Sequence, residues 1–185
     1  MGLEDTFQQL GAQLEQLDKE LQELHNTIMD DHPQEDIVLF DLRSDAVMAM
    51  LGWLAEARAA AEHAHAAVAG TPDLHRARHE LTTCHEWFNR VADKVAADFT
   101  AYEPMHELMS LGAEPGGKWR AWVGAMTEML ARCQQRMYDC GQTLFTCWRE
   151  LAARVGAASV SVQNTNIGQQ VELRDGGELL RAGVT

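Results

Sequence analysis

Positive charge is scarce in this 185-residue chain. Lysine and arginine together number 15 against 28 aspartates and glutamates, which gives a formal net charge of −13 at pH 7. A protein that coats nucleic acid needs a surplus of basic side chains to neutralise phosphates. The shortage of bases therefore argues against nucleic acid as a partner.

Long apolar runs are also missing. No stretch of 18 apolar residues occurs, so we expect no transmembrane helix and no membrane partner. The first ten residues, MGLEDTFQQL, lack the basic and apolar regions of a secretory signal, and the expected location is cytoplasmic. Only four prolines interrupt the chain, while 46% of its residues are hydrophobic. This composition excludes a wholly disordered chain and leaves room for long helices.

Apolar residues recur in a heptad near the N-terminus. Their alternating steps of four and three predict an amphipathic helix over residues 3–30, with one stripe that must be buried. The stripe comprises Leu3, Phe7, Leu10, Leu14, Leu17, Leu21, Leu24 and Ile28. It fits a helix of an intramolecular bundle, and the alternative is a coiled coil between two chains.

Three further helices are predicted over residues 33–69, 72–111 and 115–156. Proline suits the first turn of a helix, so Pro33 marks the start of the first of these, and Gly70 marks its end. The dipeptide Thr71-Pro72 followed by an acid is a start signal for the next helix. Pro104 then predicts a kink one turn before it.

The last predicted helix repeats the spacing of the first. Its stripe reads Trp119, Val123, Met126, Leu130, Cys133, Met137, Cys140, Leu144, Cys147 and Leu151. Four amphipathic helices joined by short turns predict an all-α fold, an elongated up-down-up-down four-helix bundle over residues 1–157. Four tryptophans, Trp53, Trp87, Trp119 and Trp122, are interpreted as packing near the bundle ends rather than as a ligand cage.

Charge is distributed unevenly between these helices. Residues 1–45 contain 12 acids and 2 bases, a balance of −10, whereas residues 115–157 contain 6 bases and 3 acids, a balance of +3. Opposite charges favour neighbouring positions. We therefore expect the first helix to lie beside the fourth, or beside the basic helix of another copy.

The C-terminal segment, residues 158–185, has a different character. It is rich in Asn and Gln, carries no charge before Glu172, and alternates apolar and polar residues as a strand does. Such a composition favours cross-β stacking. Two interpretations stay open: a disordered extension, or an extended tail or hairpin that pairs with another protein or a second copy. The residues predicted to interact are Val160, Val162, Asn164, Asn166, Ile167, Gly168, Gln169, Gln170 and Val171.

Three cysteines share the stripe of the last helix. Cys133, Cys140 and Cys147 are spaced seven residues apart, or about 10.5 Å along a helix, which is too far for a disulfide or a shared zinc ion. They are interpreted as small apolar core residues. A di-metal bundle needs two Glu-x-x-His motifs, and only Glu103–His106 is present. No nucleotide-binding motif occurs either, so we expect neither a metal nor another cofactor.

One histidine pattern has a catalytic alternative. Arg78-His79, followed by His85, resembles the Arg-polar-x(n)-His signature of HEPN ribonucleases, which are helical bundles. In that family the arginine and the histidine act on the RNA backbone, usually across a dimer. The resemblance implies Arg78 and His85 as catalytic residues of a ribonuclease. The alternative is a partly buried bundle histidine beside a solvated arginine.

The organisation of the chain resembles bacterial Bell-type effector domains. These are helical bundles followed by a short, uncharged, β-prone tail, which corresponds here to residues 160–171. In that family the tail templates on a matching segment of an upstream receptor, and the bundle acts at the membrane. The resemblance implies an effector of a bacterial conflict system. The strongly acidic first helix departs from the apolar, membrane-active first helix of that family.

The sequence as a whole predicts a non-enzymatic, cytoplasmic helical-bundle protein. It acts through protein–protein interaction and assembly, with the C-terminal segment as its strand-pairing or oligomerisation element. The two alternatives are an effector triggered through an amyloid-like tail and a ribonuclease that uses Arg78 and His85.

Overall fold

The computed structural model describes residues 2–31, 44–110 and 117–155, with side chains described for residues 2–27, 46–97, 121 and 124–154. It contains four helices: α1 (Leu3–Asp31), α2 (Ser44–Val68), α3 (Leu74–Ser110) and α4 (Gly117–Val155). No strand occurs in these ranges. The expected all-α class is confirmed for this part of the chain.

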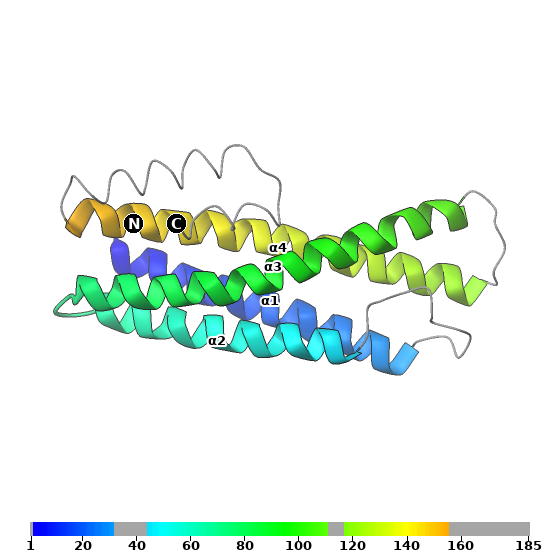
Figure 1. Ribbon diagram of the computed structural model, residues 1–185, viewed down its shortest axis with the longest axis horizontal. Helices are drawn as coiled ribbons and strands as arrows, with labels where there is room; N and C mark the ends of the chain where they lie inside the picture. The colour runs from blue at the N-terminus through cyan, green and yellow to red at the C-terminus, as the bar shows by residue number, and fades with distance from the viewer. Residues whose placement is uncertain (1, 32–43, 111–116, 156–185) are drawn as a thin grey trace.

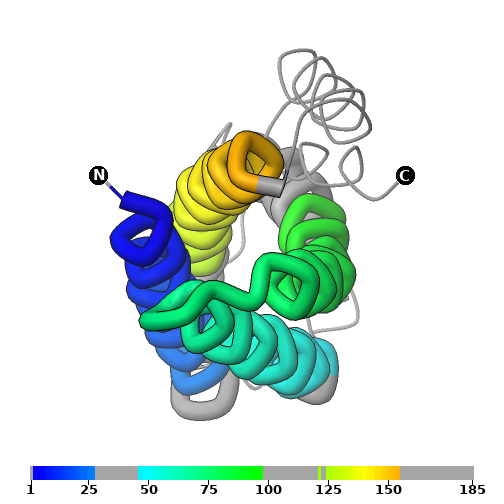
Figure 2. The backbone as a smooth tube through the Cα atoms, turned by 90° about the vertical axis from the view of Figure 1, so that its left-hand side faces the viewer, coloured from blue at the N-terminus to red at the C-terminus, as the bar shows by residue number. Residues whose placement is uncertain are grey.

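The helices form an elongated four-helix bundle. Each helix packs against the next in the chain, and α1 also packs against α4, which closes the ring. Figure 1 shows the long axes lying roughly side by side, and Figure 2 shows the four helices arranged around a common centre. The prediction that the acidic first helix lies beside the basic fourth helix is confirmed within a single chain.

Capping interactions fix two of the helix starts. The amide of Gly2 donates to Asp5 Oδ2 at 2.8 Å, so a side chain in the first turn of α1 fixes the backbone of the residue that precedes the helix. Asp73 Oδ1 accepts a hydrogen bond from the amide of Arg76 at 3.0 Å and thereby caps α3. The predicted start of this helix at residue 72 is therefore two residues early, because Asp73 is the capping residue.

The connection between α2 and α3 is short and well defined. Gly70 adopts φ of 70°, in the left-handed region that glycine enters without strain, and so terminates α2 as predicted. The amide of Asp73 donates to the carbonyl of Ala67 at 2.8 Å and closes the turn. This geometry reverses the chain and places α3 antiparallel to α2 (Figure 1).

Several predicted features lie outside the described residues. They include the predicted start of the second helix at Pro33 and the whole segment 156–185. The described part of α2 begins at Ser44. The helical backbone of α3 runs through Pro104, and Figure 1 shows the helix changing direction near its middle, well before that proline.

The core is built from the stripes that the heptads predict. The five central leucines of α1 and four residues of the predicted α4 stripe are each no more than 1% exposed: Leu10, Leu14, Leu17, Leu21, Leu24, Met126, Cys133, Cys140 and Cys147. α2 contributes mainly alanines, among them Ala57, Ala61 and Ala64, whose small side chains let the neighbouring helices approach closely. The stripe of α1 is thus buried within its own chain.

Ion pairs close the bundle on its outer surface between α1 and α4. Glu20 Oε2 lies 3.4 Å from Arg132 Nε, and Glu20 Oε1 lies 3.7 Å from Arg136 Nε. Glu23 adds a contact of 3.6 Å to Arg132. The Glu20 side chain is only 11% exposed, so it loses part of its hydration and depends on these arginines. The uneven charge of the sequence therefore acts locally, at the contact between the first and last helices.

Replacing Glu20 tests this contact. Glu20→Gln should lower the free energy of unfolding by about 1 kcal/mol in urea denaturation at low salt, with a smaller loss at high salt. Glu15→Gln is the matched control, because the Glu15 partner, Lys19, lies on its own helix at 3.1 Å. Equal effects of the two substitutions would show that the α1–α4 pairs contribute nothing specific.

Candidate functional site

All four cysteines are free thiols in the core. Burial raises the pKa of Cys84 and of Cys133 to about 12. Burial also raises the pKa of Cys140 and Cys147 on α4, and the neighbouring Cys84 of α3 adds to both shifts. At neutral pH the thiols are therefore protonated and pack as small apolar side chains, because only the thiolate is a strong nucleophile.

One thiol also makes a polar contact between the first and last helices. Cys147 Sγ donates to the carbonyl oxygen of Thr6 at 3.7 Å. The hydroxyl of Thr6 in turn donates to the carbonyl of Gly2 at 3.2 Å. The start of α1 is therefore held against the last turns of α4 from inside the bundle.

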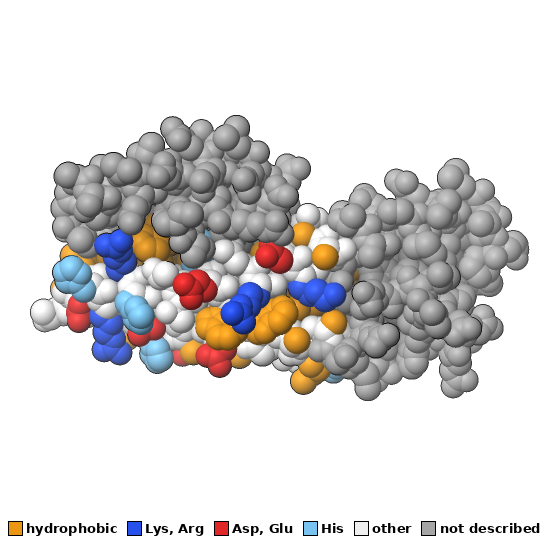
Figure 3. Space-filling view, in the orientation of Figure 1, with side chains coloured by type: hydrophobic (Ala, Val, Ile, Leu, Met, Phe, Trp, Pro, Cys, Tyr) orange, Lys and Arg blue, Asp and Glu red, His pale blue; other side chains and the backbone are white. Residues whose placement is uncertain are grey.

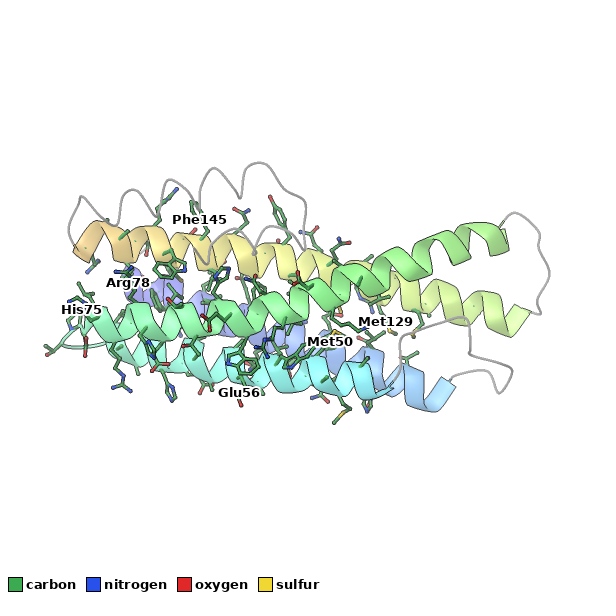
Figure 4. The ribbon with its side chains drawn as sticks, viewed as in Figure 1. Met50, Glu56, His75, Arg78, Met129 and Phe145 are labelled. Carbon is green, nitrogen blue, oxygen red and sulfur yellow. The ribbon has the colours of Figure 1, made fainter. Side chains whose placement is uncertain are left out.

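The two residues of the ribonuclease alternative lie on α3 but in different surroundings. His85 is only 2% exposed and packs within the bundle. Arg78 is half-buried, two turns nearer to the α2–α3 turn (Figure 4). Attack on an RNA phosphate requires both side chains to reach a bulky polymer at once. The burial of His85 withholds it from such a substrate in this conformation.

Two histidines join α2 to its neighbours near the α2–α3 turn. His63 Nδ1 lies 3.6 Å from Glu80 Oε2 of α3, and His65 Nε2 lies 3.9 Å from Glu4 Oε1 of α1. Both pairs are partly solvent-exposed, so they contribute modestly to stability and depend on protonation of the imidazole.

Among the described residues, no group of three or more His, Cys, Asp or Glu side chains is arranged to hold a metal ion.

An aromatic surface lies between α2 and α3. The guanidinium of Arg90 lies 4.5 Å from the ring centroid of Trp87, within the range of a cation–π contact. Because His63 pairs with Glu80, the antiparallel register brings Trp53 level with Arg90. Trp53 and Trp87 are both only partly buried. Figure 3 shows hydrophobic side chains with basic ones over them on this face.

This surface corrects the interpretation of Trp53 and Trp87 as packing near the bundle ends. Both lie on the flanks of their helices, away from the helix termini. The signal that identifies the surface in the sequence is the spacing of Trp87 and Arg90, three residues apart and so on one helix face. The partner helix of a tryptophan is not encoded in its own spacing, which is why Trp53 could not be assigned to the same surface.

The interaction residues predicted from Val160 to Val171 lie outside the described part of the chain. The same is true of the side chains of Glu103 and His106 in the last turns of α3. Within the described residues, no helix is both long enough and apolar enough to cross a membrane.

Comparison with protein-family models, with curated proteins and with solved structures found no match.

Thiol reactivity provides one test of the core. In the native protein the four cysteines should react with a thiol reagent at least about 100-fold more slowly than in 6 M guanidinium, because burial suppresses both thiolate formation and access. The measurement is the rate of colour release from a disulfide dye at pH 8. A cysteine introduced at exposed Gln8 should react as fast as free thiol in the same assay, which provides the internal reference.

The raised thiol pKa values also predict a dependence of stability on pH. Below about pH 9 the thiols are neutral in both the folded and the unfolded protein, so their contribution to the free energy of unfolding is fully present. As pH rises through the interval from about 9 to about 12, the unfolded chain ionises its thiols while the folded chain does not. The free energy of unfolding should therefore fall by roughly 1.4 kcal/mol per thiol between pH 8 and pH 10.

Urea denaturation at pH 8, 9 and 10 measures this loss. A variant with all four cysteines replaced by alanine will be less stable at pH 8, but its stability should fall less steeply with pH. Parallel pH profiles for the two proteins would show that ionisation of the thiols is not linked to unfolding.

Proposed function

We propose that this chain is a non-enzymatic, cytoplasmic helical-bundle protein that acts through protein–protein interaction. The C-terminal segment, residues 158–185, is its strand-pairing element, and the bundle is the folded domain that carries it. The predicted contact residues are those of the uncharged, Asn/Gln-rich part from Val160 to Val171.

The observation that carries the proposal is the complete burial of the leucine stripe of α1. Leu14, Leu17, Leu21 and Leu24 are 0% exposed within one chain. A coiled coil with another chain through this stripe would require the bundle to open. Assembly through the first helix, one of the two possibilities left open by its heptad, is therefore disfavoured, and the C-terminal segment remains as the assembly element.

The chemistry of that segment supports pairing between strands. Its Asn and Gln side chains carry both donors and acceptors and form ladders when identical strands stack in register. Val160, Val162 and Val171 are β-branched, and no proline interrupts the run. A matching segment, either on a second copy or on a partner protein, is the natural complement.

Replacing Ile167 tests the proposal in the full chain. Ile167→Pro removes a backbone donor and fixes φ, so it should abolish strand pairing. Ile167→Val keeps a β-branched side chain and is the matched control. The wild type and Ile167→Val should form oligomers that bind thioflavin, and Ile167→Pro should stay monomeric with an unchanged helical circular dichroism spectrum.

Light scattering gives the decisive outcomes. If all three proteins have the same mass and capture the same partners in pull-downs, the C-terminal segment is not the assembly element. A reporter fused to residues 158–185 distinguishes templated assembly from simple dimerisation, since only templating yields thioflavin-positive puncta. Cleavage of RNA that disappears in Arg78→Ala would instead favour the ribonuclease alternative.

A further inference from the structure

Two tryptophans lie close to each other on the outer surface of α2 and α3. The antiparallel register of these helices brings Trp53 level with Arg90, and Trp87 lies one turn away from that level. Both indoles pack against the core with one part and leave the rest in solvent. Partly exposed tryptophans that gather at one place are typical of recognition surfaces, because an indole contributes a large apolar area to binding.

The guanidinium of Arg90 gives this surface a positive charge. Its Cζ atom lies 4.5 Å from the ring centroid of Trp87, and Arg90 is an exposed residue. Among the residues that the structure describes, none forms an ion pair with Arg90. A guanidinium over an aromatic ring keeps its N–H donors in a planar fork, which matches the two oxygens of a carboxylate. Arg90 is therefore positioned to bind an acidic group beside the indoles.

A second base follows on the same stripe of α3. Trp87, Arg90 and Lys94 are separated by steps of three and four, which keeps them within about 60° of the helix surface and about 10.5 Å of its length. Continued in both directions, the stripe runs from Thr83 to Ala97 and contains no acid. Figure 3 shows basic side chains over hydrophobic ones on this face. In a chain of net charge −13, such a stripe favours an acidic partner by charge complementarity.

Acidic residues border the surface at its other end. Glu56, an exposed residue of α2, lies level with Trp87 in the register of the two helices (Figure 4). Glu86 is also exposed and precedes Trp87 on α3. The charge therefore changes sign along the surface, from acidic near Trp87 to basic at Arg90 and Lys94. An acidic partner avoids repulsion only if its carboxylates lie toward Lys94.

We propose that this surface, which comprises Trp53, Trp87, Arg90 and Lys94, binds an acidic amphipathic segment of a partner protein. A carboxylate of the segment pairs with the guanidinium of Arg90, and apolar side chains on either side of it pack against the two indoles. The proposal rests on described residues of α2 and α3 alone and is independent of the C-terminal segment.

A second copy of this chain is a poorer occupant. Two copies each carry a net charge of −13 and repel each other. The outer face of α1 is acidic, but none of the exposed large hydrophobic side chains in the described part of the chain belongs to that helix. It therefore supplies carboxylates without the apolar groups that the indoles require. The partner is accordingly a different protein.

A fluorescently labelled peptide provides the binding test with the full-length protein. The probe is a short peptide in which glutamate alternates with leucine and phenylalanine, and the matched probe has glutamine in place of every glutamate. In fluorescence anisotropy at low salt, the glutamate peptide should bind at least about tenfold more tightly, and the difference should shrink at high salt. Equal affinity for the two peptides, or binding of neither, would overturn the proposal.

Substitution of Arg90 tests the carboxylate contact. Arg90→Gln should weaken binding of the glutamate peptide about tenfold, and Arg90→Lys should restore only part of it, because lysine keeps the charge without the planar fork. Arg149→Gln is the matched control, since Arg149 lies over the Phe145 ring at 5.8 Å on α4 and should not contact the peptide. Similar losses in Arg90→Gln and Arg149→Gln would show that only the net charge of the protein matters and would contradict the proposal.

Glu56→Gln tests the orientation of the segment. The substitution removes an acid from the border of the surface, so it should strengthen binding of the glutamate peptide at low salt. Glu15→Gln on α1 removes the same charge at a distance and should leave the affinity unchanged. Equal effects of the two substitutions would contradict an acidic segment bound beside Glu56.

Indole N–H resonances locate the peptide on the protein. The resonances of Trp53 and Trp87 should shift on addition of the glutamate peptide, and the resonance of Trp148 on α4 should not. Trp53→Phe and Trp87→Phe each remove one signal and thereby assign it. A shift of Trp148 without shifts of Trp53 and Trp87 would place the peptide elsewhere and overturn the proposal.

Three further measurements separate other occupants from an acidic segment. Displacement of the peptide by a lower concentration of single-stranded oligothymidylate would identify a nucleic-acid site and contradict the proposal. Shifts of the Trp53 and Trp87 resonances that depend on protein concentration alone would mean that a second copy fills the surface, which also contradicts it. Ile167→Pro should bind the glutamate peptide as the wild type does, so failure of strand pairing and failure of this site are distinguishable.

Discussion

The contact between α1 and α4 is the constraint on which the bundle depends. The other three interfaces join helices that are neighbours in the chain, whereas this one joins its first and last helices. Its inner side is the leucine stripe against the thiol-bearing stripe, and its outer side is the set of pairs around Glu20. Apolar burial provides most of the stabilisation, and charge selects which helices meet.

Much of this arrangement was predictable from the sequence because its signals are periodic and local. The heptads of α1 and α4 identify their buried residues, and the opposite charges of the two segments identify them as neighbours. The capping role of Asp73 was harder to predict, because Thr71, Pro72 and Asp73 all carry start signals and only the folded turn selects among them. The Trp53–Trp87 surface depends on the register between two helices, which no single stripe encodes.

The chemically reactive side chains and those suited to recognition lie in different parts of the bundle. Thiols and His85, which suggest reactivity in a sequence, are placed in the core, where desolvation holds the thiols neutral. The outer surface carries groups suited to recognition, among them the guanidinium of Arg90 over the indole of Trp87. The chain thus separates the side chains that build the bundle from those that meet a partner.

The hydrogen bond between Cys147 and Thr6 places the start of α1 beside the last turns of α4. The four interfaces form a closed ring of helices. The packing of this ring does not depend on which pair of neighbouring helices lacks a connecting loop. A circular permutant that links Val155 to Gly2 and opens at Gly70 would keep all four interfaces. The four interfaces between the helices therefore define the bundle, and the order of the helices along the chain only determines how they are connected.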